Sequence, residues 1–175
     1  MNNINIYQLN EHIDYLSKDE LKEEVIELFK FFTDVKEYYS LKINPELEEK
    51  ILEKYKKIIK EEFFPHDGEG KMRYSVVSKA IMDFQRITSS KAKTAELMLY
   101  YVENALKFMN YHGNVQEEFY INIEGVFDKA LNYISKNNLE DQFHEKVGAI
   151  VEKSKEIGFE FMDSMIEIFD SYYTI

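Results

Sequence analysis

The residues best suited to do chemistry lie in one basic segment, residues 71–93. Six lysines and arginines stand there against one acid, which gives the segment a charge of +5 in a chain of net charge −11. A cation at the start of a helix is disfavoured by the helix dipole unless an anion or a carboxylate offsets it. Lys71, Arg73, Ser75 and Lys79, with the free N–H groups of a first helical turn, therefore predict a site for a phosphate or carboxylate ligand.

The same residues also fit a structural role. Lys79, Asp83 and Arg86 recur at the spacing of a salt-bridged face that is exposed to solvent. Arg73 could pair with an acid from another helix. The anion-binding hypothesis and this structural alternative are both open at the level of the sequence.

A second candidate surface is acidic and lies near the end of the sequence. Glu160, Asp163, Glu167 and Asp170 are spaced three, four and three residues apart, so they form one stripe along a helix. Apolar residues lie on another face of the same segment, which makes the predicted helix amphipathic. The stripe predicts either a solvated face or a surface that binds a basic partner protein.

Motifs for phosphate loops and nucleophilic catalysis are missing. A P-loop needs Gly-x-x-x-x-Gly-Lys-Ser/Thr after a strand, whereas here Pro65 replaces the first glycine and Met72 replaces the hydroxyl residue. The sequence has no Gly-x-Ser-x-Gly elbow. An active site assembled from distant residues stays possible, and Glu103, His112 and Tyr120 would be candidates if they were buried in one pocket.

Metal and thiol chemistry have little support. The four histidines are not spaced as ligand pairs, and the nearest match to a di-iron Glu-x-x-His motif is Asp141-x-x-His144, which occurs once. The absence of cysteine excludes disulfides, thiolate zinc sites, iron–sulfur clusters and cysteine nucleophiles. We expect no metal and no cofactor.

Helices must position these candidate residues, because the apolar residues recur at helical spacing. Ser17 and Glu20 form a capping box at the start of the first long helix, Asn44 and Pro45 open the second, and Asn114 caps the fifth. The expected helices cover residues 17–35, 45–64, 73–88, 91–112, 114–136, 139–157 and 159–173. The sequence thus predicts an all-α fold of six to eight helices. Antiparallel hairpins would stack into a compact bundle or a short solenoid-like array. We expect one domain over residues 1–175, with 1–16 as a loosely packed segment that could add a helix.

Charge and hydropathy limit the location and the partners. The net charge of −11 argues against non-specific binding to nucleic acid or anionic membranes. The first 16 residues carry no lysine or arginine. A signal peptide needs such a positive charge before its apolar run. No stretch approaches the roughly 20 apolar residues of a membrane span. We therefore expect a cytoplasmic protein.

Several short motifs, in this order, resemble a family of small bacterial proteins known only as a domain of unknown function. They are KEYY (36–39), LEKYKKII (52–59), KAIMDF (79–84), LYYVE (99–103), FY (119–120) and IGFEF (157–161). The resemblance implies an all-helical fold and a bacterial source, and it implies no activity and no functional residue. From the residues we predict a non-enzymatic protein-interaction module. The alternatives are an anion- or nucleotide-binding helical domain that uses residues 71–93, and an enzyme with a non-local active site.

Overall fold

Helices account for all regular structure in the computed structural model, which describes residues 4–113 and 115–173. Within these residues there are nine α-helices, one short 3-10 helix and no strand. The all-α prediction is confirmed, and the expected number of six to eight helices is wrong. Among the described residues, no helix combines the length and the apolar character needed to cross a membrane. The chain divides into two compact units, Met1–Pro45 and Glu46–Ile175. A single domain over the whole chain stays a prediction.

The described residues of the N-terminal unit form three α-helices: α1 (Ile6–Tyr15), α2 (Lys18–Phe31) and α3 (Thr33–Ile43). Side chains cap the starts of α1 and α2, whereas no side chain caps α3. The predicted capping box of α2 is confirmed. The Glu20 N–H donates to Ser17 Oγ over 3.3 Å, and the Ser17 N–H donates to the Glu20 carboxylate over 2.8 Å. Asn5 and Gln8 form the same reciprocal pair before α1. Each box satisfies two backbone donors that the first helical turn leaves unpaired.

Two features explain why the described residues form nine α-helices rather than the seven expected ranges: a helix before Ser17, which the sequence analysis allowed, and a break that it did not predict. Residues before Ser17 form α1, and the helix predicted over residues 17–35 ends at Phe31. Phe32 adopts an extended backbone (φ −113°, ψ 121°), and the chain restarts as α3. The apolar spacing continues across this break, and therefore the periodicity did not reveal it.

The described residues of the second unit form six α-helices of 14 to 22 residues. They are α4 (Glu48–Phe63), α5 (Tyr74–Ile87), α6 (Lys91–His112), α7 (Glu117–Lys136), α8 (Glu140–Ser154) and α9 (Phe159–Tyr173). The prediction that Asn44 caps the second long helix is wrong. Pro45–Leu47 forms a 3-10 turn instead, and α4 begins at Glu48. The expected cap Asn114 lies outside the described residues, and Gln116 occupies the N-cap position of α7.

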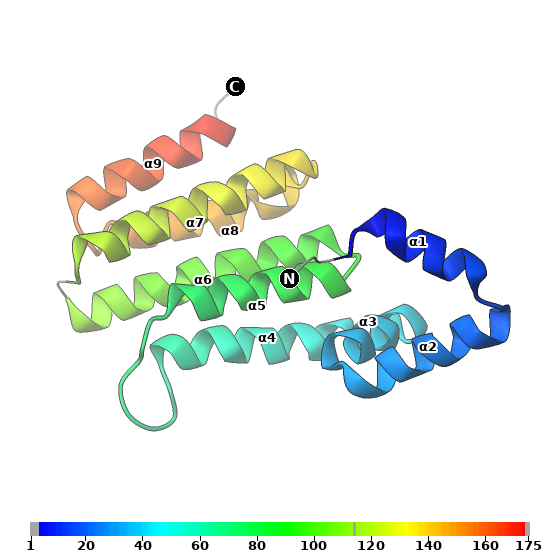
Figure 1. Cartoon of the computed structure of the whole chain (residues 1–175). Helices are drawn as coiled ribbons and strands as arrows, with labels where there is room; N and C mark the ends of the chain where they lie inside the picture. The colour runs from blue at the N-terminus through cyan, green and yellow to red at the C-terminus, as the bar shows by residue number, and fades with distance from the viewer. Residues whose placement is uncertain (1–3, 114, 174–175) are drawn as a thin grey trace. The chain divides into compact units, whose positions relative to one another are not determined.

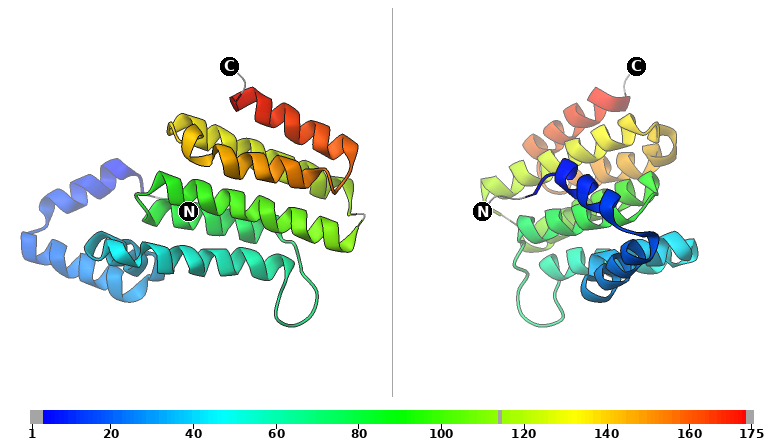
Figure 2. Two further views of the ribbon diagram at one scale, coloured as in Figure 1. Left: turned by 180° about the vertical axis from the view of Figure 1, so that it is seen from behind. Right: turned by 45° about the vertical axis from the view of Figure 1, so that its right-hand side comes forward.

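The six helices of the second unit pack mainly against neighbours in sequence (Figure 1). The helix α6 is central and contacts α4, α5, α7 and α8, while α9 covers α7 and α8. Both views in Figure 2 show the same succession, from α4 through α6 to α9. The fully buried side chains at these contacts are mostly aromatic or branched, and they include Phe63, Phe84, Phe127, Leu52, Leu97, Ile123 and Ile134.

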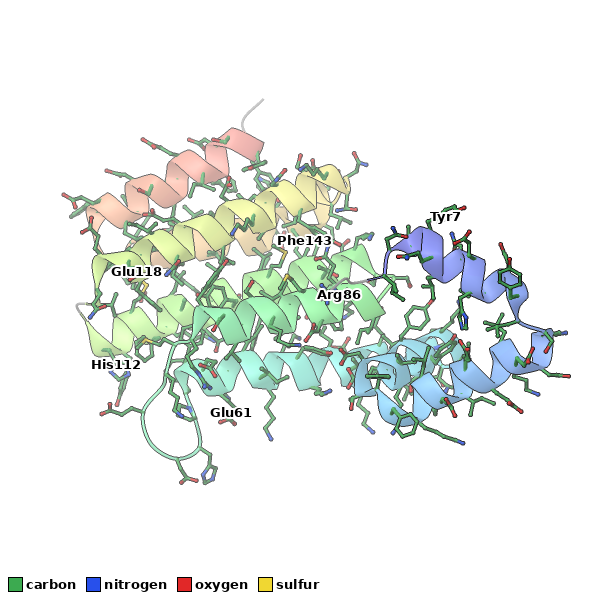
Figure 3. All side chains as sticks on the ribbon, in the orientation of Figure 1. Tyr7, Glu61, Arg86, His112, Glu118 and Phe143 are labelled. Carbon is green, nitrogen blue, oxygen red and sulfur yellow. The ribbon has the colours of Figure 1, made fainter. Side chains whose placement is uncertain are left out.

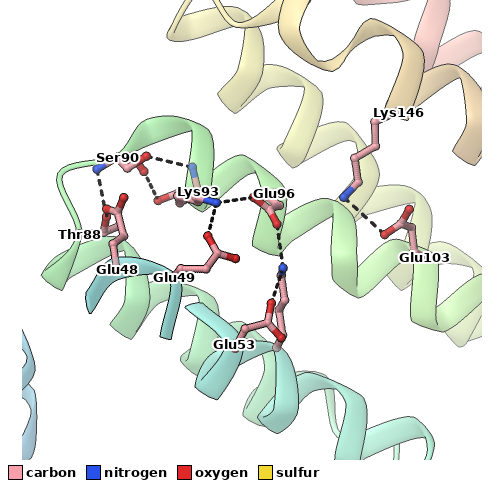
Figure 4. A network of polar contacts seen from close by, with 11 residues as sticks. Glu48, Glu49, Glu53, Thr88, Ser90, Lys93, Glu96, Glu103 and Lys146 are labelled. Atoms are coloured by element: carbon pink, nitrogen blue, oxygen red, sulfur yellow. Dashed lines mark hydrogen bonds and ion pairs between the residues drawn. The ribbon is translucent and has the colours of Figure 1, made fainter. Parts of the chain in front are cut away.

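A chain of ion pairs joins α4 to α6 (Figure 4). Lys56 Nζ lies 2.7 Å from a carboxylate oxygen of Glu53 and 2.7 Å from one of Glu96. Lys93 Nζ approaches Glu96 at 3.3 Å and Glu49 at 2.5 Å. Burial alone would raise the pKa of Glu96, but the hydrogen bonds and charges of Lys56 and Lys93 lower it overall. Glu96 is therefore charged and paired at neutral pH.

We expect Glu96→Gln to lower the free energy of unfolding at pH 7 by about 1 kcal/mol, because it removes the shared partner of two lysines. A carboxyl group with a lowered folded-state pKa stabilises the fold above its unfolded-state pKa. That stability is lost as pH falls through the folded-state value. The difference between wild type and variant should therefore shrink as pH falls below about 4.5. Urea unfolding at several pH values measures this difference.

The exposed Glu152, which pairs with Lys155, provides the matched control. Glu152→Gln should change the unfolding free energy by less than about 0.5 kcal/mol at any of these pH values. A Glu96→Gln difference that stays constant from pH 7 to pH 3 would contradict the assignment.

Candidate functional site

Arg73, the central residue of the predicted anion site, is bound to a buried carboxylate. Its guanidinium donates to both oxygens of Glu62, with Nη2–Oε1 at 2.6 Å and Nε–Oε2 at 3.1 Å. Its backbone N–H donates to Oε2 over 3.0 Å. Glu62 is only 5% exposed, and the hydrogen bonds from Arg73 lower the pKa of its carboxyl group despite this burial. The carboxylate that offsets the cation at the start of α5 thus comes from the end of α4.

The loop between α4 and α5 is held against the end of α4 by further contacts. The Met72 N–H donates to the Glu62 carbonyl over 2.8 Å. A Cβ atom at Gly70 would lie 2.4 Å from the Phe63 carbonyl oxygen, so no larger residue fits there without movement. Met72 has a φ of 49°, in the left-handed region that non-glycine residues rarely adopt. The Glu62–Arg73 pair closes this loop.

The other three residues of the predicted anion site do not share one cavity. Lys71 lines a cavity of about 740 Å³ beside His112 and Glu118, which lie at the end of α6 and near the start of α7 (Figure 3). Ser75 and Lys79 line a separate hollow of about 440 Å³, where Lys79 pairs with Asp83. Anion binding at the four residues stays a prediction, and it would require Arg73 to be shared with Glu62.

The acidic stripe lies along α9 as the spacing predicted. Glu160, Asp163, Glu167 and Asp170 are all exposed. None of their carboxylates forms an ion pair within the part of the chain that the structure describes. The inward face of α9 is buried through Phe161 and Met165. The stripe is therefore an open, unneutralised surface.

This stripe begins at a groove between the first turns of α7 and α9, which we name the α7–α9 groove. It encloses about 650 Å³. The described residues that line it include no basic side chain; they are Val115, Glu117, Tyr120, Ile121, Glu124, Ile157, Gly158, Phe159, Glu160, Phe161 and Ser164. Three of them are glutamates, and two of the apolar ones are prominent: Phe159 is 82% exposed and Ile121 is 60% exposed.

The packing of α7 against α9 positions the groove. The Tyr120 ring meets the Phe161 ring edge to face, with centroids 5.5 Å apart. Farther along both helices, the Tyr172 hydroxyl donates to the Asp128 carboxylate over 2.8 Å. The two helices thus run in the same direction, so their N-terminal turns lie at the same end (Figure 1). Carboxylates are favoured in such turns by the helix dipole.

The residues proposed for a non-local active site have separate environments. Glu103 approaches Lys146 of α8 at 3.5 Å. His112 is exposed and lies against the Phe108 ring, with centroids 4.2 Å apart. Tyr120 belongs to the α7–α9 groove. An enzymatic function that uses these three residues stays a prediction. Among the described residues, no three histidine, aspartate or glutamate side chains are grouped as metal ligands.

A family model described as a family of unknown function (DUF6155) matches residues 5–173. The chain belongs to the DUF6155 family. This confirms the resemblance to a family of unknown function, and the DUF6155 match spans both compact units. Neither the curated proteins nor the solved structures give a significant match to the chain. Membership in DUF6155 assigns no residue a role.

The sequence revealed little of the α7–α9 groove in this DUF6155 protein. The α9 stripe was predicted from its spacing, but only Glu160 of the stripe lines the groove. Phe159 was missed, and so were Glu117, Ile121 and Glu124, which lie about forty residues earlier in the chain. The only sequence pattern that could have indicated them is Ile121 between Glu117 and Glu124 on one face of a helix. Single apolar residues among charged ones are common on helix surfaces, so this pattern is not specific.

Proposed function

We propose that the chain is a non-enzymatic protein-interaction module whose α7–α9 groove receives a basic, apolar segment of a partner protein. The observation that carries the proposal is the groove itself, in which exposed apolar side chains are surrounded by three glutamates; none of its described lining residues is a lysine or an arginine. The bacterial source and the cytoplasmic location stay predictions from the sequence.

The apolar contribution comes mainly from Phe159. An aromatic ring that is 82% exposed gains from burial by a partner, since aromatic side chains bury about 150–250 Å² each. Interfaces concentrate their binding energy in such aromatic anchors near the centre. Phe159 and Ile121 thus supply the affinity for the apolar side chains of the partner segment.

The acidic side chains determine which sign of charge the partner segment must carry. Glu117, Glu124 and Glu160 surround the groove, and Asp163 extends the acidic surface along α9. Complementary charges at the rim of an interface mainly speed association and reject partners of the wrong sign. These charges are exposed, so added salt weakens their attraction to a charged partner. At 0.1 M salt, exposed charges that are more than about 10 Å apart are largely screened from each other. We therefore infer a partner segment that carries lysine or arginine.

A labelled amphipathic peptide of leucine and lysine tests this function in a fluorescence anisotropy titration with the full chain. Phe159→Ala should weaken binding about tenfold, which corresponds to 1.4 kcal/mol. The double variant Glu117→Gln, Glu160→Gln should slow association and reduce the salt dependence of binding. A peptide with glutamate in place of lysine should not bind.

Matched variants outside the groove control for general effects. Tyr111 is 80% exposed and does not line the groove, so Tyr111→Ala should leave binding unchanged. Glu145→Gln on the exposed surface of α8 serves the same purpose for the charges. Equal binding by wild type and Phe159→Ala would show that the groove is not the docking site.

A further inference from the structure

A cavity of about 740 Å³ lies in the second unit where the loop between α4 and α5 meets α6 and α7. From α7 it is lined by Glu118 and Phe119, whereas Glu117 and Ile121 line the α7–α9 groove. A helix turns by about 100° per residue, so these two sets of side chains lie on opposite faces of α7. The described linings of the cavity and the groove share only Val115, which precedes the helix. Binding in the cavity therefore does not depend on the function proposed for the groove.

Aromatic rings of the core form part of the cavity wall. Phe108 is 5% exposed, and its ring centroid lies 6.1 Å from that of Phe119. Both rings also meet the buried ring of Phe63, with centroids 5.9 Å and 6.4 Å away. Tyr74 lines the cavity too, and its hydroxyl accepts a hydrogen bond from Lys129 of α7 over 3.3 Å. These contacts fix the rings, and such a wall favours a ligand with an aromatic ring of its own.

Charged side chains of both signs line the same cavity without pairing. Lys71 and Glu69 come from the loop, and Glu118 comes from α7. Within the described part of the chain, none of these three side chains forms an ion pair. Arg73 rather than Lys71 binds Glu62, and the charge of Lys71 is the smallest of the causes that lower the pKa of that carboxyl group. The cavity thus offers an ammonium group and carboxylates that do not neutralise one another.

The backbone is fixed on both sides of Lys71. The Met72 N–H donates to the Glu62 carbonyl over 2.8 Å, and Met72 is held in the left-handed region with a φ of 49°. On the other side, Gly70 packs so closely on the Phe63 carbonyl that a Cβ atom would collide with it. Because the loop is already ordered, less conformational freedom is lost when Lys71 binds a ligand.

We propose that this cavity binds a small zwitterion with an aromatic group, of the kind that an aromatic amino acid represents. The ligand carboxylate pairs with Lys71, its ammonium group pairs with Glu118, and its ring packs against Phe108 and Phe119. The amide of Asn122, which also lines the cavity, can donate to the carboxylate or accept from the ammonium group. Small-molecule sites typically combine such apolar and aromatic walls with a few polar groups that fix the orientation of the ligand.

An NMR titration of the isotope-labelled full chain with L-phenylalanine tests the proposal. We expect the amide signals of residues 69–72, Glu118 and Phe119 to shift and to saturate, with a dissociation constant on the order of 1 mM or lower. Two analogues test the two charges separately, because phenylpropionate lacks the amine and phenylethylamine lacks the carboxylate. Each analogue should bind about tenfold more weakly, the effect of losing one hydrogen bond to a charged group.

Variants assign each charge to its partner. Lys71→Ala should weaken the binding of L-phenylalanine about tenfold and remove its advantage over phenylethylamine, since the carboxylate has lost its partner. Glu118→Gln should likewise remove the advantage over phenylpropionate. Both side chains are exposed, so neither change should unfold the chain. Lys153→Ala and Glu145→Gln on the exposed surface of α8 remove the same charges away from the cavity and should leave binding unchanged.

The absence of a saturable shift with L-phenylalanine at about 10 mM would overturn the proposal. Equal binding of L-phenylalanine and either analogue by the wild type would also overturn it, because one of the two charges would then not be recognised. The same holds for saturating shifts that are confined to the α7–α9 groove, or that persist unchanged in Lys71→Ala. Peptide binding at the groove is measured separately by fluorescence anisotropy, so either site can fail without the other.

Discussion

Replacing Phe63 with alanine is expected to lower the free energy of unfolding by about 3–5 kcal/mol, the range for a buried phenylalanine. Phe63 is 2% exposed at the end of α4. Its ring lies 5.5 Å from that of Tyr101, 5.9 Å from Phe108 and 6.4 Å from Phe119, measured between centroids. The change removes one ring from a cluster that joins α4, α6 and α7, and it leaves a cavity that the neighbours fill only in part.

Urea unfolding followed by circular dichroism measures this loss. The midpoint should fall with little change in the slope, because the surface exposed on unfolding stays similar. Phe159→Ala is the matched control, since this phenylalanine is 82% exposed and should cost less than about 0.5 kcal/mol. A Phe63→Ala loss below about 1 kcal/mol would contradict the described packing of the aromatic cluster.

Replacing Arg73 with alanine should also destabilise the fold, by about 2 kcal/mol. The variant leaves the Glu62 carboxylate buried without its charged partner, and breaking a buried pair in this way costs about 3–5 kcal/mol. The Arg73 side chain is itself 53% exposed, so water can replace part of the interaction, and the lower figure follows. Arg73→Lys should recover only part of the loss, because an ammonium cannot match the two oxygens as a guanidinium does.

Lys71→Ala controls for the loss of one positive charge in the same loop, and it should leave the unfolding free energy within about 0.5 kcal/mol of wild type. Thermal and urea unfolding of the three variants give the comparison. A stable Arg73→Ala variant would show that the pair with Glu62 contributes little, and it would favour a role for Arg73 in binding an anion. The anion-binding hypothesis predicts this result, a stable Arg73→Ala variant that no longer binds an anion.

The sequence predicted elements that depend on local contacts. Ser17 and Glu20 cap α2 as expected, because both partners of a capping box lie within one turn. The break at Phe32 escaped prediction because Phe29, Phe32 and Val35 continue the helical spacing across it. The 3-10 turn at Pro45 displaced the expected cap by three residues.

Partners that are distant in the chain could not be predicted in the same way. A carboxylate partner for Arg73 was open as an alternative, but its identity depends on how the loop folds back onto α4. The α9 stripe was visible from its spacing. The contribution of Ile121 to the α7–α9 groove could not be predicted, because it depends on α7 and α9 running side by side in the same direction. Sequence periodicity defines the face of a helix, and tertiary packing decides which faces meet.

The succession of the helices α4 to α9 has a kinetic consequence. Each helix packs mainly against the next one or two in the chain, so few native contacts require the closure of a long loop. Folds with such low contact order form in microseconds to milliseconds, because little chain entropy is lost before the contacts stabilise. During synthesis each new helix can pack against the preceding helices that it contacts, so the second unit can assemble in the order in which it is translated.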